Sequence, residues 1–282
     1  MDKDFLLVKQ KFIGNLLSRY GFWSYLTPHQ LQTWTNNGVE SKHSLITGMP
    51  EPIDLSPLEH LTIMPLVFDY LDVTISLKLG LSDEPFKTKL KMLDEKSDKD
   101  LISRLTVATY ENLSKIRNKL LHQKGSLSKC GKKVIIIKNE LSVNVSSLHH
   151  INSLSALLSK NLKNKKQLCL YDKSLILSSY KSAFPEPNQS IIESADSEGA
   201  IDVHASIMRH TIDMRPKEIT SFEDLKDHLY NCFVNEDGKP IGNTNFLFKY
   251  NDTEYSIPGE YLCKNPTITT SDIGIWATGE HT

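Results

Sequence analysis

The sequence predicts a mainly α-helical protein that begins with a helical bundle, continues through a β-hairpin and helix, and ends in a small α+β module. Three observations predict this order. Apolar residues recur every three or four positions through most of the chain before Gly125. A run of β-branched residues follows at 133–145, and turn signals flank strand-like segments near the end. We therefore expect three segments, 1–125, 126–184 and 185–282.

The first helix is expected at residues 4–20, where apolar side chains fall on one stripe at helical spacing. The stripe consists of Phe5, Val8, Phe12, Leu16 and Tyr20. Pro28 after Thr27 resembles a capped first turn, so a short helix is predicted through Trp34. Residues 36–56 contain several glycines and prolines, which predicts a loop.

Three further helices are expected before Gly125. A serine cap and a first-turn proline at 56–57 predict a helix that runs to Gly80, its C′ residue. A shorter helix is predicted through Leu93. The longest is expected to follow Ser97 and to end at Gly125. Its core-facing stripe is Leu101, Leu105, Thr109, Leu113, Ile116 and Leu120.

The pattern changes after Gly125. Residues 133–138 are rich in Val and Ile, and alternation at 141–145 predicts the second strand of a hairpin. Helical spacing returns at 147–180, and the Pro-Glu-Pro-Asn segment at 185–188 is typical of a linker.

The last segment is predicted to mix helices with a hairpin. Apolar spacing at 201–212 favours one helix, and Ser221 with Asp224 three residues later favours the capped start of another. Turn signals at 237–238 and 251–252 flank two strand-like runs, which predicts a hairpin over 246–257.

Charge is balanced overall, with a formal net charge of −1, but it is divided sharply along the chain. Residues 112–171 carry a net charge of +11, and residues 182–282 carry −10. The basic block is typical of a polyanion binder, although a solvated lysine-rich face would give the same count. We expect the acidic final third to pack against the basic block, to shield it, or to receive a partner that does.

Composition excludes several classes of protein. Hydrophobic residues make up 39% of the chain and charged residues 24%, as in soluble globular proteins. No run approaches the roughly 18 apolar residues of a membrane span, and the opening at 1–4 has acids where a signal peptide is basic. Four scattered cysteines match no zinc spacing. We expect a cytoplasmic protein without membrane contact, metal or cofactor.

One motif stands out near the end of the longest predicted helix. Arg117-Asn118 is followed three residues later by His122, the pattern R-N-x-x-x-H. Asn118 and His122 share a helix face, but Arg117 lies about 140° from His122, so the two cannot touch on an ideal helix. A simpler interpretation is that Arg117 bonds an earlier acid such as Glu111 and that the other two residues are an exposed polar pair.

The motif resembles the signature of the HEPN superfamily (higher eukaryotes and prokaryotes nucleotide-binding domains), and the resemblance covers residues 1–125 at most. It implies an antiparallel helical bundle and a metal-independent endoribonuclease of the kind found in bacterial toxins and anti-phage, abortive-infection effectors. HEPN domains usually pair to form one composite cleft, which implies a homodimer through the N-terminal bundle and leaves room for an antitoxin or regulatory partner. In this family an acid on an earlier helix sometimes contacts the motif, so Asp69 or Asp72 would orient Arg117; the simpler interpretation is that both mark the solvent edge of their helix.

The expected roles follow from the chemistry of RNA cleavage by the ribose 2′-hydroxyl. Arg117 would stabilise phosphate charge, Asn118 would orient the substrate, and His122 would serve as acid or base. Five lysines would bind the RNA backbone: Lys115, Lys119, Lys124, Lys132 and Lys133. The main alternative is a non-catalytic HEPN-type nucleotide or nucleic-acid binder or dimerisation adaptor. A DNA-binding protein built on the basic block is a third possibility.

Overall fold

A computed structural model of the chain describes residues 3–20, 22, 29–36, 39–46, 57–81, 84–96, 100–122, 125–127, 133–136, 142–163, 168–184, 188–203, 209–215, 219–232, 234–239, 242 and 244–278. The chain forms two compact units. The helical unit comprises Met1–Ser24, Met49–Lys166 and Ser179–Glu198, and the sheet unit comprises Tyr25–Gly48, Gln167–Ser178 and Gly199–Thr282. These units do not coincide with the three consecutive segments expected from the sequence, because the chain passes between them more than once.

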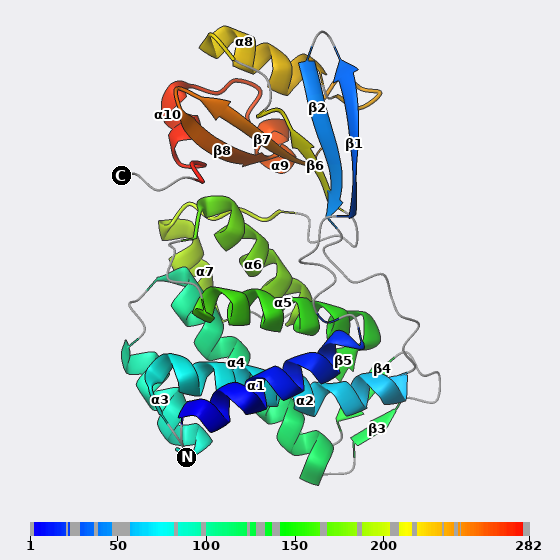
Figure 1. The fold of residues 1–282 in the computed structure, drawn as a ribbon, viewed down its shortest axis with the longest axis vertical. Coiled ribbons are helices and arrows are strands. Elements are labelled where there is room, and N and C mark those ends of the chain that lie inside the picture. Colours follow the sequence, from blue (N-terminus) through cyan, green and yellow to red (C-terminus); the bar gives the residue numbers. More distant parts are fainter. Residues whose placement is uncertain are drawn as a thin grey trace. The chain divides into compact units, whose positions relative to one another are not determined.

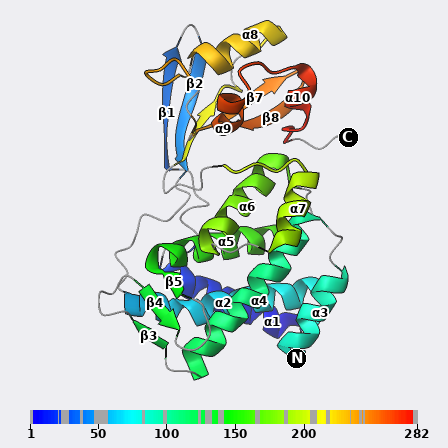
Figure 2. The same cartoon turned by 180° about the vertical axis from the view of Figure 1, so that it is seen from behind.

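The helical unit is built around α2 (Pro57–Leu79), and α1 lies along it in both views (Figures 1 and 2). The other helices of this unit contact α2 or one another. They are α1 (Lys3–Ser18), α3 (Phe86–Lys96), α4 (Leu101–His122), α5 (Val145–Lys163), the end of α6 (Leu170–Ala183) and α7 (Gln189–Ser197). The predicted mainly helical character is confirmed. No helix within the described ranges is both long enough and apolar enough to cross a bilayer.

The C-terminal end of α2 lies where the sequence predicted it, whereas α4 begins at Leu101, four residues after the start signal expected at Ser97. Gly80 has a φ of +70°, and the amide of Leu81 donates to the carbonyl of Ser76 at 2.9 Å, which is a Schellman C-cap. At the start of α4, the Asp100 carboxylate accepts from the amide of Ile102 at 2.9 Å. The predicted core stripe of α4 is confirmed from Leu101 to Ile116, whose members are at most 2% exposed, and the side chain of Leu120 lies outside the described residues.

The predicted first helix is confirmed as α1, and the apolar stripe at its start faces solvent. Phe5, Val8 and Phe12 are 53%, 67% and 63% exposed. The buried face carries Leu6, Gln10, Ile13, Gly14 and Leu17. Gly14 brings α1 close to α2, since a Cβ there would lie 3.1 Å from Cε2 of Tyr70. The buried Gln10 side chain donates to the Thr74 hydroxyl at 2.6 Å. A close backbone approach and a satisfied polar contact decide which face is buried.

The hairpin predicted after Gly125 is confirmed and forms part of a three-stranded sheet. Strands β3 (Gly125–Leu127), β4 (Lys133–Ile136) and β5 (Ser142–Asn144) are antiparallel in the order β3-β4-β5. Helix α5 begins at the residue after β5. This sheet follows directly on the helix that carries the R-N-x-x-x-H motif.

The sheet unit has a five-stranded mixed sheet in the order β1-β2-β6-β7-β8. Its strands are β1 (His29–Asn36), β2 (Val39–Ile46), β6 (Arg209–Asp213), β7 (Thr244–Tyr250) and β8 (Thr253–Pro258), and only β6 and β7 pair in parallel within the described part of the chain. Short helices accompany it: α8 (Phe222–Asp227), the π-helix η2 (His228–Cys232), α9 (Gly259–Lys264) and α10 (Thr270–Gly274).

Local signals predicted part of this unit correctly. The hairpin over 246–257 is confirmed, with positive φ angles of 48° and 62° at Asn251 and Asp252 that suit a two-residue turn. The Ser221 cap is confirmed as well, because its side chain accepts from the amide of Asp224 at 3.0 Å. Trp276 and Phe246 are fully buried in the core of this unit.

Two predictions in the sheet unit are wrong. Residues 29–36 form β1 rather than a helix, and 39–46 form β2 rather than a loop. Asn36 pairs with Val39, and the two residues between them in the sequence are Asn-Gly. This dipeptide is the strongest short-range hairpin signal, and here it outweighs the helix-start signal of Thr27 and Pro28. Residues 209–212, expected in a helix, belong to β6, where pairing with β2 and β7 satisfies their backbone.

Candidate active site

The motif arginine is held by an acid on α2. Nε of Arg117 lies 3.3 Å from Oδ1 of Asp69, and its guanidinium carbon lies 5.2 Å from the centre of the Phe68 ring. Glu111, the partner suggested by sequence spacing alone, instead pairs with Lys115 at 2.9 Å. Nε of Arg117 is buried without an aligned hydrogen bond among the described residues. Arg117 is therefore positioned by its ion pair with Asp69.

The other aspartate of α2, Asp72, has a structural role. Asp72 accepts from Nζ of Lys89 at 2.8 Å and from the hydroxyl of Tyr110. The Tyr110 ring is stacked on Phe68, with ring centres 5.5 Å apart, and it also contacts Phe86. Burial and the neighbouring carboxylate raise the pKa of Tyr110, so it remains a donor at neutral pH. The network ties α2, α3 and α4 together around the motif.

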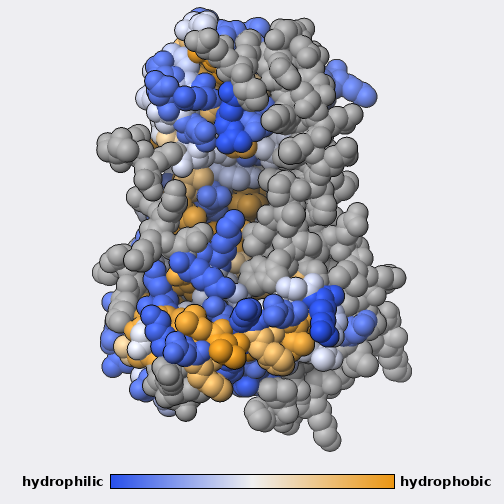
Figure 3. All heavy atoms as spheres, in the orientation of Figure 1, coloured by the Kyte–Doolittle hydropathy of each residue, from blue (hydrophilic) through white to orange (hydrophobic). Residues whose placement is uncertain are grey.

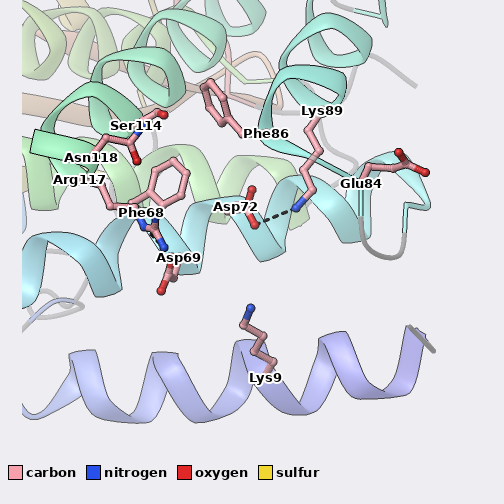
Figure 4. Close-up of a pocket in the computed structure, with 10 residues that line it drawn as sticks. All are labelled: Lys9, Phe68, Asp69, Asp72, Glu84, Phe86, Lys89, Ser114, Arg117 and Asn118. Carbon is pink, nitrogen blue, oxygen red and sulfur yellow. Dashed lines mark hydrogen bonds and ion pairs between the residues drawn. The ribbon is translucent and has the colours of Figure 1, made fainter. Parts of the chain in front are cut away.

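These side chains surround a cavity of about 310 Å³ (Figure 4). Arg117 and Asn118 form its α4 wall, α2 and α3 supply further walls, and Lys9 points toward the cavity from α1. Three cations face three acids there: Lys9, Lys89 and Arg117 against Asp69, Asp72 and Glu84. The cavity is polar and open, and its charges come mainly from four helices.

The carboxyl group of Asp69 has an unusual balance of forces. Burial raises its pKa above the ordinary value, although Arg117 and Lys9 act to lower it. Desolvation, together with repulsion from Asp72, therefore outweighs the attraction of both cations. Keeping the ionised Asp69 carboxylate beside the motif therefore lowers the free energy of unfolding, as functional groups commonly do.

Replacing Asp69 with asparagine is expected to leave the free energy of unfolding at pH 7 unchanged or to raise it. The native state of the wild type binds a proton more tightly than the unfolded chain, so its stability falls as pH rises from about 3.8 to the raised native pKa. The asparagine side chain does not ionise, so the Asp69→Asn variant lacks this loss. Urea unfolding between pH 4 and pH 7 measures the difference.

Asp72→Asn is the matched control, because Asp72 pairs with the buried Lys89. Leaving that ammonium without a carboxylate is expected to cost about 3–5 kcal/mol. Equal destabilisation by Asp69→Asn and Asp72→Asn would contradict the positioning role assigned to Asp69.

The remaining predicted site residues are distributed as follows. Asn118 is exposed on the cavity wall, and Lys115 lies on the exposed side of α4. Lys119 and His122 belong to the last turns of α4, and Lys133 begins β4. Lys124 and Lys132 lie outside the described residues.

Sequence reasoning missed Lys9, Phe68, Glu84 and Lys89 as parts of the site. They come from elements far apart in the chain, and no local pattern marks them. The two acids that interrupt the apolar α2 were the one usable signal. No group of three or more His, Cys, Asp or Glu side chains suited to a metal ion occurs in the described part of the chain.

Comparisons with protein-family models, with curated proteins and with solved structures found no match. The site therefore has to be interpreted from its own geometry: an arginine positioned by an acid, an exposed asparagine one residue later, and a polar cavity in front of both.

Proposed function

We propose that the protein is a metal-independent endoribonuclease that cleaves RNA by attack of the ribose 2′-hydroxyl. One observation carries the proposal. Arg117 and Asn118, the first two motif residues, line an open polar cavity in which Asp69 positions the arginine. The resemblance to the HEPN superfamily adds the expectation of a bacterial toxin or anti-phage effector.

The proposed roles match the charges that develop during cleavage. The guanidinium of Arg117 stabilises the negative charge that gathers on the equatorial phosphate oxygens. Asn118 orients the substrate, and His122 exchanges a proton with the attacking or leaving oxygen. The basic block at 112–171, which begins within α4, attracts the RNA backbone.

Incubation of the protein with total RNA in EDTA tests this function. We expect cleavage with products that carry 5′-hydroxyl ends and 2′,3′-cyclic or 3′-phosphate ends, because the neighbouring 2′-hydroxyl is the nucleophile. DNA lacks this hydroxyl and should stay intact. A strict Mg²⁺ requirement, or cleavage of DNA, would overturn the mechanism.

A non-catalytic binder is the second candidate, and one observation favours it. Three acids oppose the three cations of the cavity, and the Arg117 side chain is only 30% exposed. A module of this kind would bind RNA or a nucleotide and leave it intact. Binding without product in the same EDTA assay distinguishes it from the nuclease.

The exposed stripe of α1 provides a surface for the expected homodimer. Phe5, Val8 and Phe12 form an apolar patch on an outer face of the helical unit (Figure 3). At roughly 150–250 Å² for a whole aromatic side chain, the stripe exposes on the order of 300 Å². That is enough for the apolar centre of an interface that buries about 800 Å² per partner.

A second copy fits this stripe by charge as well. Antiparallel pairing of two α1 helices sets Phe5 against the partner's Leu16 and Val8 against the partner's Phe12. The same register places Asp4, at one end of the exposed face, near the partner's Arg19 at the other end. Asp4 and Arg19 are both exposed, so each end gains opposite charges.

Phe5→Ser/Phe12→Ser is expected to convert the dimer into a folded monomer. Each exposed aromatic side chain contributes about 1.5–3 kcal/mol to the free energy of association when the interface buries it. Each copy loses two such side chains in the variant, so the dissociation constant of the dimer rises more than about 100-fold. Sedimentation or light scattering measures the mass. Leu7→Ser is the control, because Leu7 is 46% exposed on another face of α1. A monomeric wild type at assay concentration would exclude this interface.

A further inference from the structure

A second cavity, of about 260 Å³, lies where α1, α2 and the last turn of α5 meet. Tyr70 of α2 and Lys163 of α5 form one side, and Lys11 and Asn15 of α1 form the other. The neighbouring residue of α2, Asp69, lines the motif cavity. The two cavities have no described lining residue in common, so they are distinct.

Lys163 is fixed against the Tyr70 ring. Its ammonium donates to the Tyr70 hydroxyl at 2.6 Å and lies 5.1 Å from the ring centre. Tyr70 is held in turn by Phe22, whose ring meets it edge-on at 5.9 Å, and by the close approach of Gly14. Lys163 is exposed as a whole residue, but these two contacts place its ammonium at the cavity before a ligand binds.

The charges here differ from those in the motif cavity. None of the described residues that line this second cavity is acidic, whereas two are lysines. Partial burial lowers the pKa of Lys163, because the ammonium loses part of its hydration. Burial raises the pKa of Tyr70 to about 12, so its hydroxyl stays protonated and can donate. An anion in the cavity would offset the lost hydration.

We propose that this cavity binds a phosphate group through Lys163, Lys11, Tyr70 and Asn15. Two ammonium groups, a phenol and an amide supply the donors that phosphate oxygens accept. The cavity is smaller than the roughly 300–1,000 Å³ of most small-molecule sites, which suits one phosphate with the rest of the ligand outside. The phosphate belongs either to an RNA strand or to a small phosphorylated molecule. The site stands whether or not the motif cavity cleaves RNA.

The test compares wild type with Lys163→Gln, Lys11→Gln and Lys160→Gln in two assays. Lys160→Gln is the matched control, because Lys160 is exposed on α5 and its replacement removes the same charge. The first assay measures the melting temperature in inorganic phosphate against sodium chloride of equal ionic strength. Phosphate stabilises proteins in general, so the difference between variants is the measured quantity.

The second assay measures the affinity of a fluorescent single-stranded RNA by anisotropy at several salt concentrations. If the phosphate belongs to RNA, Lys163→Gln should weaken binding about tenfold more than Lys160→Gln. Its salt slope should also fall by about 0.7, the value for one phosphate contact on a single strand. Circular dichroism confirms folding, and Lys11→Gln covers the case in which Lys163→Gln unfolds.

The outcomes separate the two sources of phosphate. A small phosphorylated ligand is identified if Lys163→Gln and Lys11→Gln lose the phosphate-specific shift in melting temperature but bind RNA as tightly as Lys160→Gln does. A selective loss of RNA affinity identifies a strand phosphate. If all three variants match one another in both assays, the cavity is not a phosphate site.

Discussion

Replacing His122 with alanine is expected to lower the rate of RNA cleavage by about 10²–10⁴-fold, the usual contribution of a general acid or base. His122 lies in the last turn of α4, at the end of the helix that carries Arg117 and Asn118. Histidine is the side chain whose unperturbed pKa lies near neutral pH, so an imidazole suits the transfer of the proton that each step of cleavage moves. Cleavage is measured on a defined RNA in EDTA.

Binding of RNA should survive the His122→Ala change, because backbone affinity comes from lysines rather than from one histidine. His150→Ala is the matched control, since His150 lies on α5 and outside the residues that line the motif cavity. Full activity in His122→Ala would exclude the assigned role, and so would an equal loss in His150→Ala.

Replacing Arg117 with alanine is expected to cost about 2.7–4 kcal/mol of transition-state stabilisation, or about 10²–10³ in rate. The Arg117 side chain lines the motif cavity, and its ion pair with Asp69 fixes its direction. Arg117→Lys should recover only part of the rate, because an ammonium cannot present the planar fork that matches phosphate oxygens. Single-turnover rates separate this loss from weaker binding.

Arg104→Ala provides the control on the same helix. The Arg104 guanidinium donates to the backbone carbonyl of Ser190 at 3.1 Å, so its loss affects the contact between α4 and α7 and not the cavity. We expect Arg104→Ala to lower stability slightly and to leave the rate unchanged. A comparable loss of rate in both variants would mean that Arg117 acts through folding.

The position of the motif could be predicted because it depends on one helix. The motif lies late in α4, and its first two residues reach the cavity because they point away from the buried stripe of Leu113 and Ile116. The partner of Arg117 was left open between Glu111 and the acids of α2. Asp69 holds it, because packing of α4 on α2 brings that carboxylate within 3.3 Å.

The first helix shows the limit of periodicity most clearly. The spacing of Phe5, Val8 and Phe12 predicted a stripe, and α1 does carry one, but this stripe is exposed and another face of α1 is buried. A helical pattern marks which residues share a face, and it does not state what covers that face. Gly14 and Gln10 carried no comparable signal, although they make the contact with α2.

The sequence by itself determined the features that depend on neighbours in the chain: the caps of α2 and α8, the hairpin of β7 and β8, and the placement of the motif on a long helix. Only the tertiary structure decided that β2 pairs with β6, that Lys9 and Lys89 face the motif cavity, and that α1 leaves an apolar stripe exposed. The physical reason is the distance along the sequence over which the stabilising contacts act. Caps and turns are fixed by hydrogen bonds within a few residues, whereas strand partners and cavity walls depend on which distant surfaces pack together.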